Sequence, residues 1–318
     1  MKFNHEAVEG GLEIKTNIEN GKAFLEFAFL FTEEGSQDTR CQVRLQIMDC
    51  KGQLVLQCNY PLWEEEPACG RLMHPQLWRG MENPCLYFAK AYLIGEGGEV
   101  LDTLEKSFPL RTLEYIAGKG WFLNHVPYEM RVVEYDYFIK RREVLRENLE
   151  ILRRMGANTI YTKEKSIPAE MREMCDELGF LLWSGECLLA RVKEDIRLPG
   201  EELYRLSENL PNWEGLLTQD GFFLKDSYYY YKALWSKEPF VYIGREGMVK
   251  PQKGVLNVKV YSNHKKVALY VDGILFAFQS GEGECLFEEI PIEGYPLVLT
   301  AEAGECGMSV TIFESEQV

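Results

Sequence analysis

The sequence of 318 residues carries 50 acidic and 35 basic side chains, which give a formal net charge of −15. This excess of negative charge disfavours nucleic acid and anionic membranes as partners, because both repel an acidic surface. The first residues lack the apolar stretch of a signal peptide, and no apolar run long enough to span a bilayer occurs, so we expect a cytoplasmic protein without membrane association.

The cysteines and histidines predict neither a disulfide framework nor a metal site. The chain has nine cysteines, an odd number, without a CxxC pair, and only four histidines. Reduced thiols that act as small apolar side chains fit this pattern better. Phosphate-binding and dinucleotide-binding fingerprints are also missing from the sequence, so we expect no metal and no cofactor.

Three regions follow one another along the chain. Residues 1–115 contain alternating apolar and polar segments, such as 12–16 and 23–29, separated by turn residues at 19–22, which predicts an immunoglobulin-like β-sandwich. Residues 116–240 predict strands that alternate with two helices, and residues 241–318 return to strands, with a hairpin turn at Asp272 and Gly273. The predicted fold class is therefore multidomain β and α/β.

The two helices of the middle region have recognisable ends. Apolar residues at helical spacing run over 138–155 and stop at Gly156, which suits a C-terminal cap. A second helix is predicted over 168–178, because Pro168 stands at its start and Gly179 directly follows it. Short apolar runs before and after these helices indicate parallel strands in successive βα units.

Several segments resemble glycoside hydrolase family 2, the β-galactosidase and β-glucuronidase-like enzymes. Residues 119–131, 152–162 and 174–186 are similar, in order, to the family patterns KGFxLNGKPxxLRGVN, LKxxNxNAVRTSHYP and LCDELGxLVxxE. Residues 77–87 resemble LWSPENPYLY, and residues 215–235 resemble the barrel ending GLxDxxGxPKDSYYxYKSLW. The resemblance implies a sandwich, a (β/α)8 barrel and a second sandwich, with the family's N-terminal jelly-roll domain lacking.

The implied barrel is too short to be complete. Arg131 to Trp235 supplies 105 residues, whereas a (β/α)8 barrel typically has about 250. In the family, the acid/base glutamate follows an asparagine on strand four and the nucleophilic glutamate ends strand seven. No Asn-Glu pair occurs between Glu186 and Trp235, so the resemblance implies a truncated barrel remnant without this catalytic pair.

Side chains at the ends of the remaining parallel strands are the candidate site, because such strands direct their C-terminal residues to one face. Carboxylates there would raise one another's pKa and form an acid/base pair; alternatively they are solvated or paired with nearby lysines. Aromatic rings there would stack on a sugar, or fill the space of the missing strands. The catalytic candidates are Asp136, Glu164 and Glu186, and the substrate-binding candidates are Glu134, Tyr161 and Trp183.

Three functions remain open. The first is a pseudoenzyme that serves as a carbohydrate-related binding, regulatory or assembly protein. The second is an active, β-galactosidase-like glycoside hydrolase that uses carboxylates of the remaining strands or of a partner chain, and the third is a purely structural remnant. Since an incomplete parallel sheet leaves an edge and an apolar face uncovered, we also expect a homodimer that covers the incomplete barrel.

Overall fold

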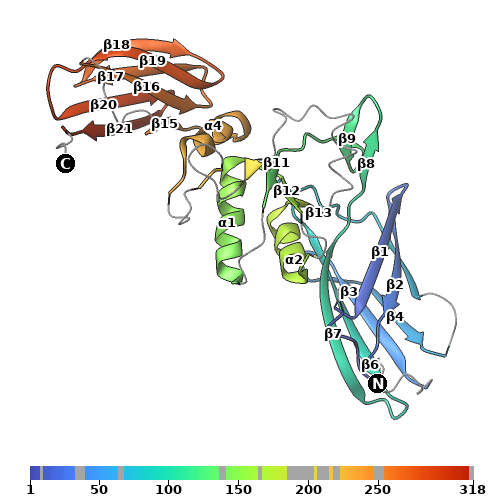
Figure 1. Ribbon diagram of the computed structural model, residues 1–318. Helices are drawn as coiled ribbons and strands as arrows, with labels where there is room; N and C mark the ends of the chain where they lie inside the picture. Colours follow the sequence, from blue (N-terminus) through green and yellow to red (C-terminus); the bar gives the residue numbers. More distant parts are fainter. Residues whose placement is uncertain are drawn as a thin grey trace. The chain divides into compact units, whose positions relative to one another are not determined.

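A computed structural model gives the architecture of the chain (Figure 1). It divides into two compact units, of which the first comprises residues 1–130, 137–149 and 158–199, and the second residues 131–136, 150–157 and 200–318. The structure describes residues 1–7, 10–32, 40–63, 68–135, 141–163, 167–184, 204–205, 215–217, 223–245 and 254–314.

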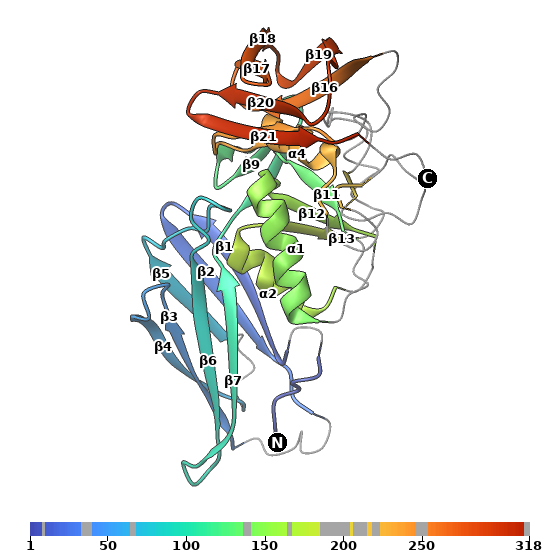
Figure 2. The ribbon, with the colours of Figure 1, turned by 90° about the vertical axis from the view of Figure 1, so that its left-hand side faces the viewer.

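The first unit begins with a two-layered β-sandwich (Figure 2). One sheet has the strand order β1-β2-β5 and the other the order β4-β3-β6-β7, with antiparallel pairing throughout. The strands are β1 (Leu12–Glu19), β2 (Lys22–Phe29), β3 (Gln42–Met48), β4 (Leu54–Pro61), β5 (Ala68–Met73), β6 (Leu86–Ile94) and β7 (Val100–Pro109).

Alternating side chains build the core of this sandwich. In β2, Ala23, Leu25 and Phe27 are buried while the residues between them are exposed, as the period of two along a strand requires. Residues of both sheets join the same hydrophobic cluster, such as Leu25 of the first sheet and Leu45 and Leu93 of the second. The predicted β-rich fold is confirmed here.

The rest of the first unit contains a small sheet and parts of the α/β region. The small sheet has the order β10-β9-β8, formed by β8 (Leu113–Ile116), β9 (Gly120–Leu123) and β10 (Val126–Pro127). The strands β12 (Thr159–Thr162) and β13 (Leu181–Ser184) pair in parallel, and α2 (Ala169–Leu178) connects them, so they form one βα unit with the topology predicted for this segment.

The predicted helix ends agree with the structure where they are described. Helix α2 follows Pro168 and ends at Gly179, whose φ of 87° is the left-handed conformation of a C-terminal cap. Helix α1 (Arg142–Met155) ends before Gly156, which also has a positive φ. The predicted start of this helix, at residues 138–140, lies outside the described residues.

The second unit contains the C-terminal sandwich and the elements that precede it. Its parallel strand pair consists of β11 (Val132–Glu134) and β14 (Tyr204–Arg205), and helix α4 (Asp226–Trp235) leads into the sandwich. The sandwich strands are β15 (Val241–Ile243), β16 (Val255–Ser262), β17 (Lys266–Val271), β18 (Ile274–Ser280), β19 (Gly283–Pro291), β20 (Leu297–Ala303) and β21 (Cys306–Ile312).

The two sandwiches share one strand order. The C-terminal sheets run β15-β16-β19 and β18-β17-β20-β21, which repeats, strand for strand, the order of the N-terminal pair of sheets. A second hydrophobic cluster, which includes Val258, Leu269 and Leu299, fills the space between these sheets. None of the helices in the described ranges has the length and apolar character needed to cross a membrane.

Candidate functional site

The parallel pair β12 and β13 positions two of the predicted site residues. All four residues of β12 are buried, whereas β13 becomes more exposed toward Ser184. The register places Tyr161 opposite Trp183, so the two side chains lie on the same face of this strand pair. Their local environments differ, because Tyr161 is 2% exposed and Trp183 is only half-buried.

The other predicted site residues fall elsewhere. Glu134 ends β11 in the second unit, opposite Arg205 of β14, and its side chain is buried. Asp136, Glu164 and Glu186, the three catalytic candidates, lie outside the described residues. Within the first unit, the structure therefore brings together Tyr161 and Trp183 from the predicted set.

Trp183 belongs to an aromatic cluster that the sequence did not single out. Its ring meets that of Trp121 edge-on, with centroids 4.9 Å apart and planes at 71°, and Tyr115 lies 5.2 Å from Trp121 on the other side. Tyr115 and Trp121 face each other across the β8-β9 hairpin. We call Tyr115, Trp121 and Trp183 the aromatic cluster.

The aromatic cluster is partly exposed and has unused polar atoms. All three residues are intermediate in exposure. Neither indole N–H has a hydrogen-bond acceptor among the described residues, although a buried indole N–H usually finds one. Aromatic residues on both sides of the turn around Gly118 and Gly120 were the only sequence signal for this cluster, and they equally suit an ordinary hairpin.

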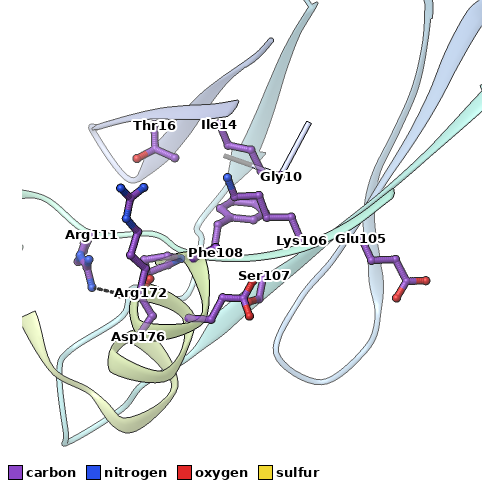
Figure 3. A pocket seen from close by; sticks show the side chains of 13 residues that line it. Gly10, Ile14, Thr16, Glu105, Lys106, Ser107, Phe108, Arg111, Arg172 and Asp176 are labelled. Carbon is purple, nitrogen blue, oxygen red and sulfur yellow. Dashed lines mark hydrogen bonds and ion pairs between the residues drawn. The ribbon is translucent and has the colours of Figure 1, made fainter. Parts of the chain in front are cut away.

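A polar hollow of about 350 Å³ lies in the same unit, between the sandwich and α2 (Figure 3). Strands β1 and β7 supply one wall and the first turns of α2 the other, so that basic and acidic groups face one space. The residues that line it are Gly10, Ile14, Thr16, Glu105, Lys106, Ser107, Phe108, Pro109, Arg111, Ala169, Arg172, Glu173 and Asp176.

An ion pair closes one end of the hollow. The Arg111 Nη1 atom donates to Asp176 Oδ1 at 2.7 Å, and the Arg111 guanidinium stacks 4.3 Å above the centre of the Trp78 ring. Trp78 is fully buried, and its Nε1 donates to the backbone oxygen of Asp176 at 2.9 Å. These contacts fix the position of α2 against the sandwich, so the shape of the hollow depends on them.

Burial dominates the ionisation of Asp176. Desolvation raises the pKa of this carboxyl group above its ordinary value, and the nearby Arg111 and Arg172 guanidinium groups lower it by less. A raised pKa in the folded state means that the folded protein binds the proton more tightly than the unfolded chain. Ionised Asp176 therefore reduces the free energy of unfolding as pH rises through its folded pKa.

We expect Asp176→Asn to change the pH dependence of stability in one direction. The asparagine does not titrate, so the unfolding free energy of the wild type minus that of the variant should be largest below pH ~4 and fall as pH rises toward 7. Urea unfolding of both proteins across this range measures the difference. A difference that grows with pH would show that Arg111 outweighs desolvation.

Metal-ligating side chains do not gather in the described ranges. No group of three or more histidine, cysteine, aspartate or glutamate side chains among them is arranged to hold a metal ion.

Sequence comparisons find distant relatives over part of the chain. No family model matches the chain. Two proteins of Formosa agariphila, both described as "Putative beta-glucuronidase", are 26% identical over 145 residues and 23% identical over 154 residues. These alignments cover 43% and 46% of this chain but only 14% and 18% of the relatives, so the chain spans less than a fifth of their length.

Solved structures match the fold over nearly the whole chain. An FMN-binding β-glucuronidase from Faecalibacterium prausnitzii L2-6 superposes with a TM-score of 0.81 at 18% identity, over 99% of this chain and 75% of the other. A "putative beta-galactosidase" from Bacteroides fragilis gives 0.80 at 16%, over 98% and 74%. The β-glucuronidase 2 of Bacteroides uniformis gives 0.77 at 16%, over 98% and 62%.

These similarities agree with the family-like segments of the sequence, which occur in the same order as in the family. Identities of this size support a shared fold rather than a shared activity. The chain is thus similar in fold to the β-glucuronidase and β-galactosidase-like proteins, and it is shorter than these structural neighbours.

Proposed function

We propose that this chain is a family 2-like protein with a carbohydrate-related binding, regulatory or assembly function, and that it lacks the family's catalytic glutamate pair. One observation carries the proposal: the chain matches β-glucuronidase and β-galactosidase-like folds over 98–99% of its length, yet the segment from Arg131 to Trp235 has only 105 residues. A complete (β/α)8 barrel typically needs about 250 residues. The strands that would carry both glutamates have no room in this segment.

The described strands are consistent with a truncated barrel. They form two parallel pairs, β12 with β13 and β11 with β14, separated in sequence by α1 and α2. Eight parallel strands make a closed barrel. A retaining glycosidase also needs two carboxyl groups about 5–5.5 Å apart, and Glu134 is the one predicted carboxylate that the described residues contain.

The aromatic cluster supports binding as the retained role. Tyr115, Trp121 and Trp183 present partly exposed rings that lie next to one another. Aromatic side chains combine an apolar face with a polar edge, which suits the alternating C–H and hydroxyl surface of a sugar. A sugar that packs against these rings would need no carboxylate pair to be held.

The test combines binding with turnover. Mono- and oligosaccharides are titrated into the full chain by calorimetry, and aryl β-glycosides are offered at the same protein concentration. The proposal predicts saturable binding without hydrolysis. Trp183→Ala should weaken binding by about tenfold or more, which corresponds to ~1.4 kcal/mol. Trp183→Phe should retain most of the affinity. Trp63→Ala is the control, because this tryptophan of the sandwich is 55% exposed, and it should leave binding unchanged.

A second function is favoured by the names of the relatives. Since the structural neighbours include β-glucuronidases, an active glycoside hydrolase that uses Asp136, Glu164 or Glu186 is the alternative. Hydrolysis that disappears in Glu186→Gln or Glu164→Gln would replace the binding proposal with this one. If circular dichroism shows a folded protein that neither binds nor hydrolyses these sugars, the purely structural role is favoured.

A further inference from the structure

Two thiols of the first sandwich meet at one side chain. Cys50 lies in the turn between β3 and β4, and Cys85 directly precedes β6. The Cys50 thiol donates to Gln76 Oε1 at 2.9 Å, and the Cys85 sulfur lies 3.7 Å from the same oxygen. The Gln76 side chain therefore brings together two thiols that are 35 positions apart in the sequence.

Local hydrogen bonds hold both thiols in place. In the turn, Asp49 Oδ1 accepts from the backbone N–H groups of Lys51 and Gln53, each at 2.9 Å, which fixes the backbone on both sides of Cys50. The Gln76 N–H donates to the Tyr87 hydroxyl group at 2.8 Å. Hydrogen bonds within the folded sandwich therefore fix the positions of both thiols.

The two thiols differ in their access to solvent. Cys50 is exposed, whereas Cys85 is 5% exposed. Burial, with a smaller effect of the neighbouring Cys50 thiol, raises the pKa of Cys85 to about 12. An exposed thiol with a buried neighbour is the arrangement in which one sulfur attacks a reagent and the other resolves the product.

We propose that Cys50 and Cys85 form a dithiol modification site that a low-molecular-weight disulfide, such as oxidised glutathione, converts to an intramolecular disulfide. The Cys50 thiolate attacks one sulfur of the reagent, and the first glutathione leaves as a thiolate that takes up a proton. The Cys85 thiol then loses its proton and attacks Cys50 Sγ, which releases the second glutathione. Two protein thiols are oxidised and one glutathione disulfide is reduced to two thiols.

A second pair of cysteines in the same sandwich provides the internal control. Cys58 on β4 and Cys69 on β5 both lie near Tyr60, whose hydroxyl group donates to the Cys69 backbone oxygen at 2.7 Å. Cys69 is exposed, like Cys50. The phenol occupies the position beside these thiols, so we expect reagent adducts here without a protein disulfide.

Closure of the Cys50–Cys85 disulfide would change the stability of the sandwich. It joins the β3–β4 turn to the start of β6, and the enclosed segment contains β4 and β5. A crosslink of this kind stabilises chiefly because it restricts the unfolded chain. We expect the thermal midpoint of the first unit to rise by several degrees after oxidation, and to return to its starting value with a reducing agent.

The test uses the full chain and oxidised glutathione, followed by digestion without reduction and mass spectrometry. We expect a crosslinked peptide pair containing Cys50 and Cys85 in the wild type and in Cys69→Ser. Cys50→Ser should yield no crosslink at Cys85. Cys85→Ser should accumulate a stable glutathione adduct at Cys50, because the resolving thiol is missing; this variant is the most specific readout, since a merely exposed Cys50 would show the same adduct in the wild type.

Three results would overturn the proposal. The first is a glutathione adduct that persists at Cys50 in the wild type as it does in Cys85→Ser. The second is a crosslink from Cys50 to a cysteine other than Cys85. The third is a reaction confined to Cys69, with Cys50 unmodified under the same conditions.

Discussion

Trp78→Ala is expected to lower the unfolding free energy of the first unit by about 3–5 kcal/mol, the usual range for removal of a buried large aromatic side chain. Trp78 is fully buried, its Nε1 donates to the Asp176 backbone oxygen, and its ring stacks against the Arg111 guanidinium. The substitution removes the buried ring, its hydrogen bond to Asp176 and its stacking contact with Arg111.

Two further variants separate these contributions. Trp78→Phe keeps an aromatic ring but leaves the Asp176 carbonyl oxygen without its donor, so we expect a loss of about 1–3 kcal/mol. Trp63→Ala, at a tryptophan that is 55% exposed, should stay within about 0.5 kcal/mol of the wild type. Urea unfolding followed by circular dichroism measures the stability, and hydrogen exchange at α2 amides assigns the transition. A loss below ~1 kcal/mol in Trp78→Ala would show that Trp78 does not hold α2 against the sandwich.

Gly179→Ala is expected to destabilise the same region by about 2–5 kcal/mol. Gly179 has a φ of 87°, and an added Cβ would lie 2.5 Å from the Met81 backbone nitrogen and 2.6 Å from the Gly80 carbonyl carbon. The left-handed conformation costs a residue with a side chain ~1–2 kcal/mol, and overpacking against backbone adds ~1–3 kcal/mol. Backbone atoms cannot rotate away as the end of a long side chain can.

Gly52→Ala is the matched control for this prediction. Gly52 also has a positive φ, of 76°, but an added Cβ would meet no atom within 4 Å. Its expected cost is therefore the conformational part alone, ~1–2 kcal/mol. Thermal and urea unfolding of both variants measure the difference, and equal losses would show that the loop at Gly80 and Met81 moves aside.

The helix α2 shows how much of the fold local sequence can predict. Pro168 and Gly179 mark its ends in the sequence, and the structure places the helix at Ala169–Leu178 between them. Proline and glycine act on their own backbone angles, so their effect is readable without knowledge of the rest of the chain. The alternation that predicts β2 is local in the same sense.

Contacts between distant residues could not be predicted from one sequence. Trp78 and Asp176 are 98 positions apart, and neither residue carries a local signal for the other. Trp121 and Trp183 meet only because β9 and β13 come together in the fold. The burial of individual cysteines could not be predicted either. The composition indicated thiols that serve as small apolar side chains, but Cys50 and Cys69 are exposed.

The contacts of Trp78 and Gly179 also bear on where the chain can be divided. Both residues join the N-terminal sandwich to α2 within the first unit, so we expect the sandwich to depend on α2 for part of its stability. A fragment that stops at residue 115 would lack Asp176 and open the fully buried indole of Trp78 to water. We therefore expect the sandwich and α2 to unfold in a single cooperative transition. We also expect limited proteolysis to cleave first outside this cooperative region, and not near residue 115, where the strand pattern predicts a domain boundary.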